Sequence, residues 1–167
     1  MSNFKIISNH VVPQAISEIS TEQLLPLGTI VSAVDRASTN YGSGQFIYAQ
    51  GVASTAEGSW VTINEDDWTT ALLAANAIGR VGVAMAANVA SSYGWYQIGG
   101  KAIGKALTGY VDNALVYATA TAGSIDDAVV SGDRVKNAKG ASAVGTPSSG
   151  FAEFEINNPF MDDGSAA

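Results

Sequence analysis

The chain of 167 residues contains no cysteine and only one histidine, His10. Without cysteine it has no disulfide framework, no thiolate zinc site and no cysteine nucleophile, and one histidine cannot complete an all-His/Cys zinc site. Basic residues are also scarce, with 8 Lys and Arg against 15 Asp and Glu, which gives a formal net charge of -7. Proteins that bind nucleic acid or rest on an anionic bilayer neutralise phosphates with basic residues, so we expect neither partner.

A long hydrophobic run is missing as well. A membrane-spanning helix needs about 20 mostly apolar residues, and the most apolar stretch, 70–90, is interrupted by Asn76, Arg80 and Asn88. The first residues lack the basic start, apolar run and small-residue cleavage site of a secretory signal. We therefore expect an intracellularly made, soluble product that has no membrane partner.

The most informative stretch that is present holds three aromatic residues in four positions, Tyr93, Trp95 and Tyr96, with glycines on both sides. In an extended strand, Tyr93 and Trp95 project to one side and Tyr96 to the other. The upstream segment 80–86 alternates larger apolar residues on one face with Gly and Ala on the other. We predict that the two segments are adjacent antiparallel strands, with the ring of Trp95 or Tyr96 over the Gly/Ala face.

Similar short segments, β-branched or alternating and bounded by turn residues, recur along the chain at 29–34, 45–50, 59–63, 107–111, 114–119 and 151–156. This spacing predicts an all-β, single-domain antiparallel fold with little helix: a β-sandwich, a jelly roll or a barrel. Segment 69–78 has helix propensity, but glycines confine it, so a strand or bend is favoured. The last strand is expected to end at Asn158-Pro159.

Three regions follow from this pattern. Residues 1–27 mix polar and apolar positions around Pro13 and Pro26 and are interpreted as an extended N-terminal arm, in which Ser20 or Thr21 could cap one helical turn. Residues 28–160 form the β-rich domain. Residues 161–167 are small and acidic, and a flexible tail is expected.

The sharpest enzymatic motif is Gly99–Lys105, which fits the GxxxxGK frame of a phosphate-binding loop. Ala106 stands where such a loop needs Ser or Thr for magnesium, and Gly109 would interrupt the following helix. A glycine-rich strand edge or bulge is the preferred interpretation. The acidic pairs at 66–67, 126–127 and 162–163 lack EF-hand spacing and are interpreted as solvated turns. We predict no enzyme, no catalytic or metal residues and no cofactor.

The segments 45–53, 60–64 and 81–86, followed by the aromatic strand 93–98, together resemble the head decoration (cement) proteins of tailed bacteriophages. The resemblance spans residues 28–160. It rests on the order and spacing of the strands and on the aromatic strand, and it includes no catalytic signature.

The resemblance implies a structural virion protein, made in the host cytoplasm, that binds the major capsid protein on the outer capsid surface and stabilises contacts between its subunits, usually as a homotrimer. Trp60, Tyr93, Trp95 and Tyr96 are then candidate core or trimer-interface aromatics. The extended arm is the candidate capsid contact, through its apolar residues Phe4, Ile6, Ile7, Val11 and Val12. The alternative is another non-enzymatic virion component, such as a head fibre base or a tail or adhesin module.

Overall fold

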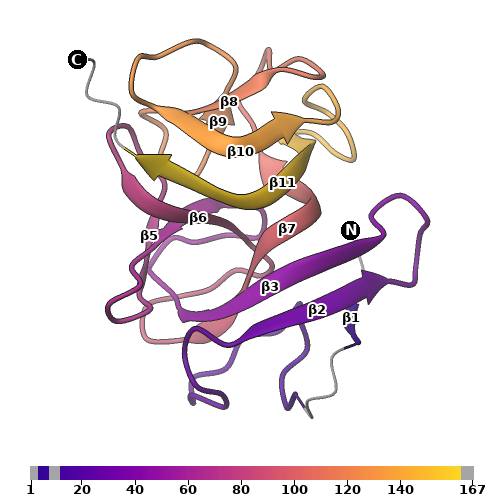
Figure 1. The fold of residues 1–167 in the computed structure, drawn as a ribbon, viewed down its shortest axis with the longest axis vertical. Coiled ribbons are helices and arrows are strands. Elements are labelled where there is room, and N and C mark those ends of the chain that lie inside the picture. The colour runs from indigo at the N-terminus through magenta and orange to yellow at the C-terminus, as the bar shows by residue number, and fades with distance from the viewer. Residues whose placement is uncertain (1–3, 8–11, 163–167) are drawn as a thin grey trace.

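The structure, a computed structural model, describes residues 4–7 and 12–162, and every regular element in these ranges is a β-strand (Figure 1). The predicted all-β, antiparallel character is confirmed, and the strands belong to one sheet. The strands are β1 (Phe4–Ile6), β2 (Ile30–Asp35), β3 (Ser43–Gln50), β4 (Trp60–Ile63), β5 (Thr70–Leu72), β6 (Ile78–Ala84), β7 (Tyr93–Lys105), β8 (Leu115–Ala118), β9 (Ile125–Asp126), β10 (Arg134–Gly140) and β11 (Phe151–Asp162).

All 11 strands belong to one sheet with the order β1-β2-β3-β7-β6-β11-β10-β8-β9, and β4 joins β5 to β6. Strand β7 is its centre, because it pairs antiparallel with β3, β6 and β11. The sheet does not close into a barrel, so the sandwich-like alternative describes it best. In Figure 1, β2 and β3 cross the lower half, while β10 and β11 lie above them.

Strand β7 separates two hydrophobic cores, as its aromatic alternation predicts. Trp95 is 1% exposed and packs with Phe46 and Tyr48 on one side, whereas Tyr96 packs with Ile47 on the other. The predicted neighbour also pairs with β7, through Val83 opposite Gln97 and Ala84 opposite Tyr96. A third core lies under β10 and β11 and includes Trp60, Tyr110 and Phe154. Covering both faces of β7 excludes water from its backbone hydrogen bonds.

The N-terminal region packs against the domain instead of extending away from it. Strand β1 pairs with β2, and Gln14 and Ile16 are buried. The indole Nε1 of Trp95 donates to the carbonyl of Gln14, and Ser20 forms a β-bridge with Tyr93. No helical turn forms at Ser20, whose hydroxyl accepts from the amide of Glu22 in a bend. Phe4 and Ile16, with half-buried apolar neighbours from the same region, therefore cover the aromatic face of β3 and β7.

Two other expectations are wrong. Segment 107–111 is a turn, because Gly109 has a φ of 107° and the side chain of Tyr110 turns into the core, where its hydroxyl donates to the Ala114 carbonyl. Strand β11 continues through Pro159, and Met161 is 1% exposed in the third core, so it does not belong to a flexible tail. The proline is tolerated because the register of β10 against β11 shifts there. Residues 163–167 lie outside the described ranges.

Candidate docking surface

The predicted aromatic candidates are core residues. Trp60, Trp95 and Tyr96 are each at most 1% exposed, which removes them as interface residues. Tyr93 is half-buried, and its ring stacks on that of Tyr48 with centroids 6.3 Å apart. Of the two roles foreseen for these four residues, packing in the core is therefore the one that the structure bears out for Trp60, Trp95 and Tyr96.

The candidate arm residues divide between the core and the surface. Phe4 is 6% exposed, and its ring meets that of Phe46 edge-on at 4.8 Å, so the interpretation of Phe4 as a capsid contact is wrong. Ile6 and Val12 are half-buried against the same core. Ile7 is 50% exposed. Val11, like His10, lies outside the described residues. Only Ile7 is thus shown at the surface, directly beside β2.

Ile7 lies at one end of an open sheet face that crosses the four strands β2, β3, β7 and β11. Its amide donates to the carbonyl of Ser32, Ser32 pairs with Gln45, Gln45 with Gly99, and Gly99 with Asn157. This row crosses a shallow depression of about 450 Å³, here named the open-face depression, which is lined by Ile7, Ser32, Ser43, Gly44, Gln45, Gly99, Gly100, Ile156 and Asn157. Residues from four distant parts of the chain therefore form one continuous surface.

Glycine shapes the floor of the open-face depression. Gly100 has a φ of 93°, and a Cβ at this position would overlap the carbonyl oxygen of Ser43. The backbones of β3 and β7 approach closely here, beside the bulge that shifts their register between Gln45 and Phe46. The glycine-rich edge or bulge predicted for this segment is what the structure has. Gly99 and Gly100 contribute no side chain to this floor, and the side chain of the exposed Gln45 lies next to Gly99.

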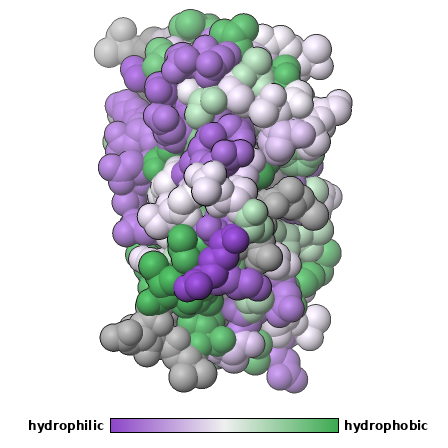
Figure 2. Space-filling view, turned by 90° about the vertical axis from the view of Figure 1, so that its right-hand side faces the viewer, coloured by the Kyte–Doolittle hydropathy of each residue, from purple (hydrophilic) through white to green (hydrophobic). Residues whose placement is uncertain are grey.

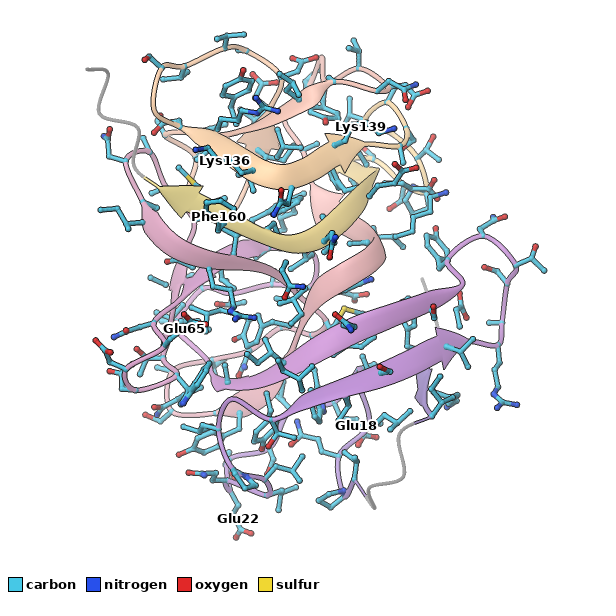
Figure 3. The ribbon with its side chains drawn as sticks, viewed as in Figure 1. Glu18, Glu22, Glu65, Lys136, Lys139 and Phe160 are labelled. Carbon is cyan, nitrogen blue, oxygen red and sulfur yellow. The ribbon has the colours of Figure 1, made fainter. Side chains whose placement is uncertain are left out.

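None of the described residues that line the open-face depression is charged, although the chain carries a net charge of -7. Charge lies on either side of it. In Figure 3, Glu18 and Glu22 lie below β2, whereas Lys136 and Lys139 lie on β10, above β11. The Nζ atom of Lys139 pairs with Glu155 at 3.1 Å, and that of Lys136 lies over the Phe160 ring at 5.8 Å. The depression is therefore a neutral strip between charged borders.

Exposed apolar side chains add to this neutral strip. Ile30, which opens β2, is 50% exposed like Ile7, and Val34 on the same side of β2 is half-exposed. Figure 2, which faces the right-hand side of Figure 1, shows hydrophobic residues beside a strongly hydrophilic group in the lower half, the half in which β1–β3 lie, whereas the upper half is mainly hydrophilic or intermediate. Apolar groups on an uncharged face lower the free energy needed to remove water from that face when a partner binds.

A buried polar cluster fixes the β2–β3 hairpin beside the open-face depression. The Tyr41 hydroxyl donates to Glu153 at 2.9 Å, and Lys101 pairs with the other carboxylate oxygen of Glu153 at 2.6 Å. The Nζ atom of Lys101 also lies 5.6 Å from the centroid of the Tyr41 ring. Burial and the neighbouring carboxylate raise the pKa of Tyr41 to about 12. The cluster ties the hairpin to β7 and β11, which hold the far side of the depression.

The GxxxxGK segment has no loop geometry. Gly99–Lys105 forms the second half of β7, in register with β11 from Asn157 to Phe151. Its amides are committed to the sheet, and Gly104 leaves room for the Trp60 indole. In the described part of the chain, no three His, Cys, Asp or Glu side chains lie close enough together to hold a metal ion. A phosphate-binding loop is therefore not what the glycines of this segment form.

Within the same ranges, no helix could span a membrane. Comparisons with protein-family models, with curated proteins and with solved structures gave no match. A functional proposal therefore rests on the sequence and on the surface described above.

Proposed function

We propose that the protein is a decoration (cement) protein that binds the outer surface of an icosahedral phage capsid, where it stabilises contacts between major capsid protein subunits. The open-face depression is the observation that carries this proposal. A flat, neutral face with Ile7 and Ile30 at its edge, on a protein of net charge -7, suits burial against another protein. In this proposal the open face takes the role that the sequence suggested for the whole arm.

The strength of binding would come from multiplicity. A stable protein interface buries about 1,200 to 2,000 Å², and one open sheet face supplies the contact of a single copy. A homotrimer presents three such faces at once, so the second and third contacts form at high effective concentration. Each contact is then modest, while the trimer holds several capsid subunits together. The acidic surface outside the neutral strip stays in solvent, away from the packaged nucleic acid.

The experiment places one charge at the centre of the depression. Gln45 is exposed and lies mid-row between Ser32 and Gly99. Gln45→Lys and Gln45→Glu each bury an unpaired charge in the proposed interface, and we expect either to weaken capsid binding about tenfold or more. The matched control is Ala71→Lys on β5, which is exposed and outside the depression.

Wild type and variants are analysed by size-exclusion chromatography with light scattering, alone and with expanded capsids assembled without the protein. We expect the wild type and Ala71→Lys to be trimers that comigrate with capsids, and the Gln45 variants to be trimers that bind poorly. If the Gln45 variants bind capsids as well as the wild type does, the open face is not the capsid-binding surface. Wild type that ignores capsids would point to another virion component, such as a fibre base or tail module, whose location in the particle distinguishes it.

A further inference from the structure

A second hollow lies away from the open face and is lined by different residues. It has a volume of about 220 Å³ and is formed by the turn at Glu57-Gly58, by Met85 directly after β6, by Ile103 on β7 and by the loop that leads into Phe151. Met85, Ile103 and Phe151 are half-exposed, and the described wall contains one ionisable side chain, Glu57. We name this hollow the Met85 pocket.

The walls of the Met85 pocket are fixed by backbone hydrogen bonds. The amide of Gly58 donates to the carbonyl of Ala84 at 2.8 Å, and the carbonyl of Gly58 accepts from the amide of Lys105 at 2.8 Å. On the other side, Phe151 accepts from Gly145 through its carbonyl. Gly58 has a φ of 76°, and its missing side chain leaves space for the Phe151 ring. A site whose walls are already in place loses little entropy when it is filled.

The size of the pocket restricts its occupant. Small-molecule sites usually have about 300 to 1,000 Å³, so the Met85 pocket is too small for a nucleotide or a similar cofactor. A dry cavity of about 150 Å³ accepts benzene, so one aromatic side chain fits. A methionine wall adapts to such a ring and makes favourable sulfur–aromatic contacts. Interfaces use pockets of this kind to hold a single aromatic anchor residue.

Charge restricts the occupant further. Glu57 is exposed, and among the residues that the structure describes its carboxylate takes part in no ion pair. We propose that the Met85 pocket docks one aromatic side chain from a partner protein, and that a Lys or Arg next to this anchor pairs with Glu57. This inference does not rest on the proposed capsid function, because the open-face depression and the pocket share no residue.

The probe is the peptide Ac-Phe-Lys-NH2, with Ac-Ala-Lys-NH2 and Ac-Phe-Glu-NH2 as comparisons. The chain has three methionines, so isotope-labelled methionine methyl groups give a simple NMR spectrum. Met85 reports on the pocket, and the buried Met161 is the internal control. We expect Ac-Phe-Lys-NH2 to shift the Met85 signal saturably and to leave Met161 unchanged. Ac-Ala-Lys-NH2 should give no saturable shift, and Ac-Phe-Glu-NH2 should bind about threefold more weakly because its charge repels Glu57.

Glu57→Gln should remove this preference for lysine over glutamate, whereas Glu22→Gln, which changes an exposed carboxylate that does not line the pocket, should retain it. The proposal would be overturned if neither phenylalanine peptide shifted the Met85 signal, or if Met85 and Met161 shifted equally. A Met85 shift on dilution of the protein alone would assign the pocket to a second copy and also overturn it. None of these results depends on capsids, so they are independent of the capsid experiment.

Discussion

The open-face depression and the Met85 pocket are both floored by glycine with positive φ, yet they differ in shape and lining. The depression is shallow and mixed in polarity, its described lining residues are uncharged, and it crosses β2, β3, β7 and β11. The pocket is smaller and mostly apolar, and it has a single carboxylate, Glu57, among its lining residues. A broad neutral face suits a broad partner surface, whereas a small apolar hollow suits one side chain. One sheet therefore carries two surfaces suited to different kinds of contact.

The largest expected effect comes from the floor of the depression. Gly100→Ala requires an L-residue at a φ of 93° and places its Cβ against the backbone oxygen of Ser43, which cannot move without disturbing β3. We expect a loss of about 2 to 4 kcal/mol in the free energy of unfolding. Urea unfolding of the wild type and the variant measures this loss. Unchanged stability would show that β3 and β7 do not approach each other as described.

The matched change in the Met85 pocket, Gly58→Ala, should lower the free energy of unfolding by less. Gly58→Ala also demands a positive φ, of 76°, but its Cβ would meet the Phe151 ring at 2.6 Å, and a half-exposed ring can turn aside. We expect a loss of about 1 to 2 kcal/mol, mainly from the backbone. The same urea experiment gives the difference between the two glycines. A larger loss of stability for Gly58→Ala than for Gly100→Ala would contradict the view that the floor of the depression is rigid and that the Phe151 wall of the pocket can move.

The hydrogen bond that holds the hairpin beside the depression should contribute less again. Tyr41→Phe removes the donor to Glu153, while the pairing of Glu153 with Lys101 remains. We expect a loss of about 0.5 to 1.5 kcal/mol near neutral pH. Thermal unfolding at neutral pH provides the measurement, and a variant as stable as the wild type would mean that this bond contributes nothing.

The stability difference between the wild type and Tyr41→Phe should also depend on pH. Because burial and Glu153 raise the pKa of Tyr41 from 10.0 in the unfolded chain to about 12, its stabilising effect is complete below pH 10 and disappears as the pH rises from 10 to 12. Burial also raises the pKa values of Tyr48, Tyr96 and Tyr110, so the wild type and Tyr41→Phe should both lose stability. The gap between them should narrow over this range, and a constant gap would contradict the assignment.

The smallest effect on stability is expected at the edge of the open face. Ile30→Ser replaces a side chain that is 50% exposed, so unfolding should change by less than about 0.5 kcal/mol. Capsid binding should nevertheless weaken, because the residue belongs to the proposed interface. Denaturation and capsid comigration of the same preparation separate the two effects. A variant that loses stability but binds normally would mean that Ile30 acts only within the fold.

Local patterns in the sequence predicted the centre of the sheet well. The alternation of Tyr93, Trp95 and Tyr96 predicted two covered faces, and the Gly/Ala face of 80–86 predicted the neighbouring strand. For Gly99–Lys105 the sequence predicted a glycine-rich strand edge or bulge, but its weak strand propensity did not predict that β7 continues through it to Lys105, paired with β11. Its strand conformation comes from pairing with β11 and from the Trp60 ring over Gly104. Tertiary packing here overrides the local preference.

The candidate site was harder to predict from the sequence than the centre of the sheet. The open-face depression depends on the register of Ser32, Gln45, Gly99 and Asn157, which belong to strands far apart in the chain. Ser32 and Gln45 are polar positions in otherwise largely apolar segments, and the strand order that places them side by side could not be read from those segments. Phe4 was assigned to a capsid contact because an apolar residue in a polar segment resembles a docking residue until its own core is known.

Capsid binding through the open face is tested most directly by the orientation of the protein on expanded capsids. Electron cryomicroscopy of capsids to which the protein has been added measures this orientation. We predict density on the outer surface in which the open face, formed by β2, β3, β7 and β11, lies against the shell and the opposite face of the sheet points into solvent. Density in which the open face points away from the shell would contradict its assignment as the capsid-binding surface. Capsids that carry no added density at saturating protein would contradict the proposed function itself.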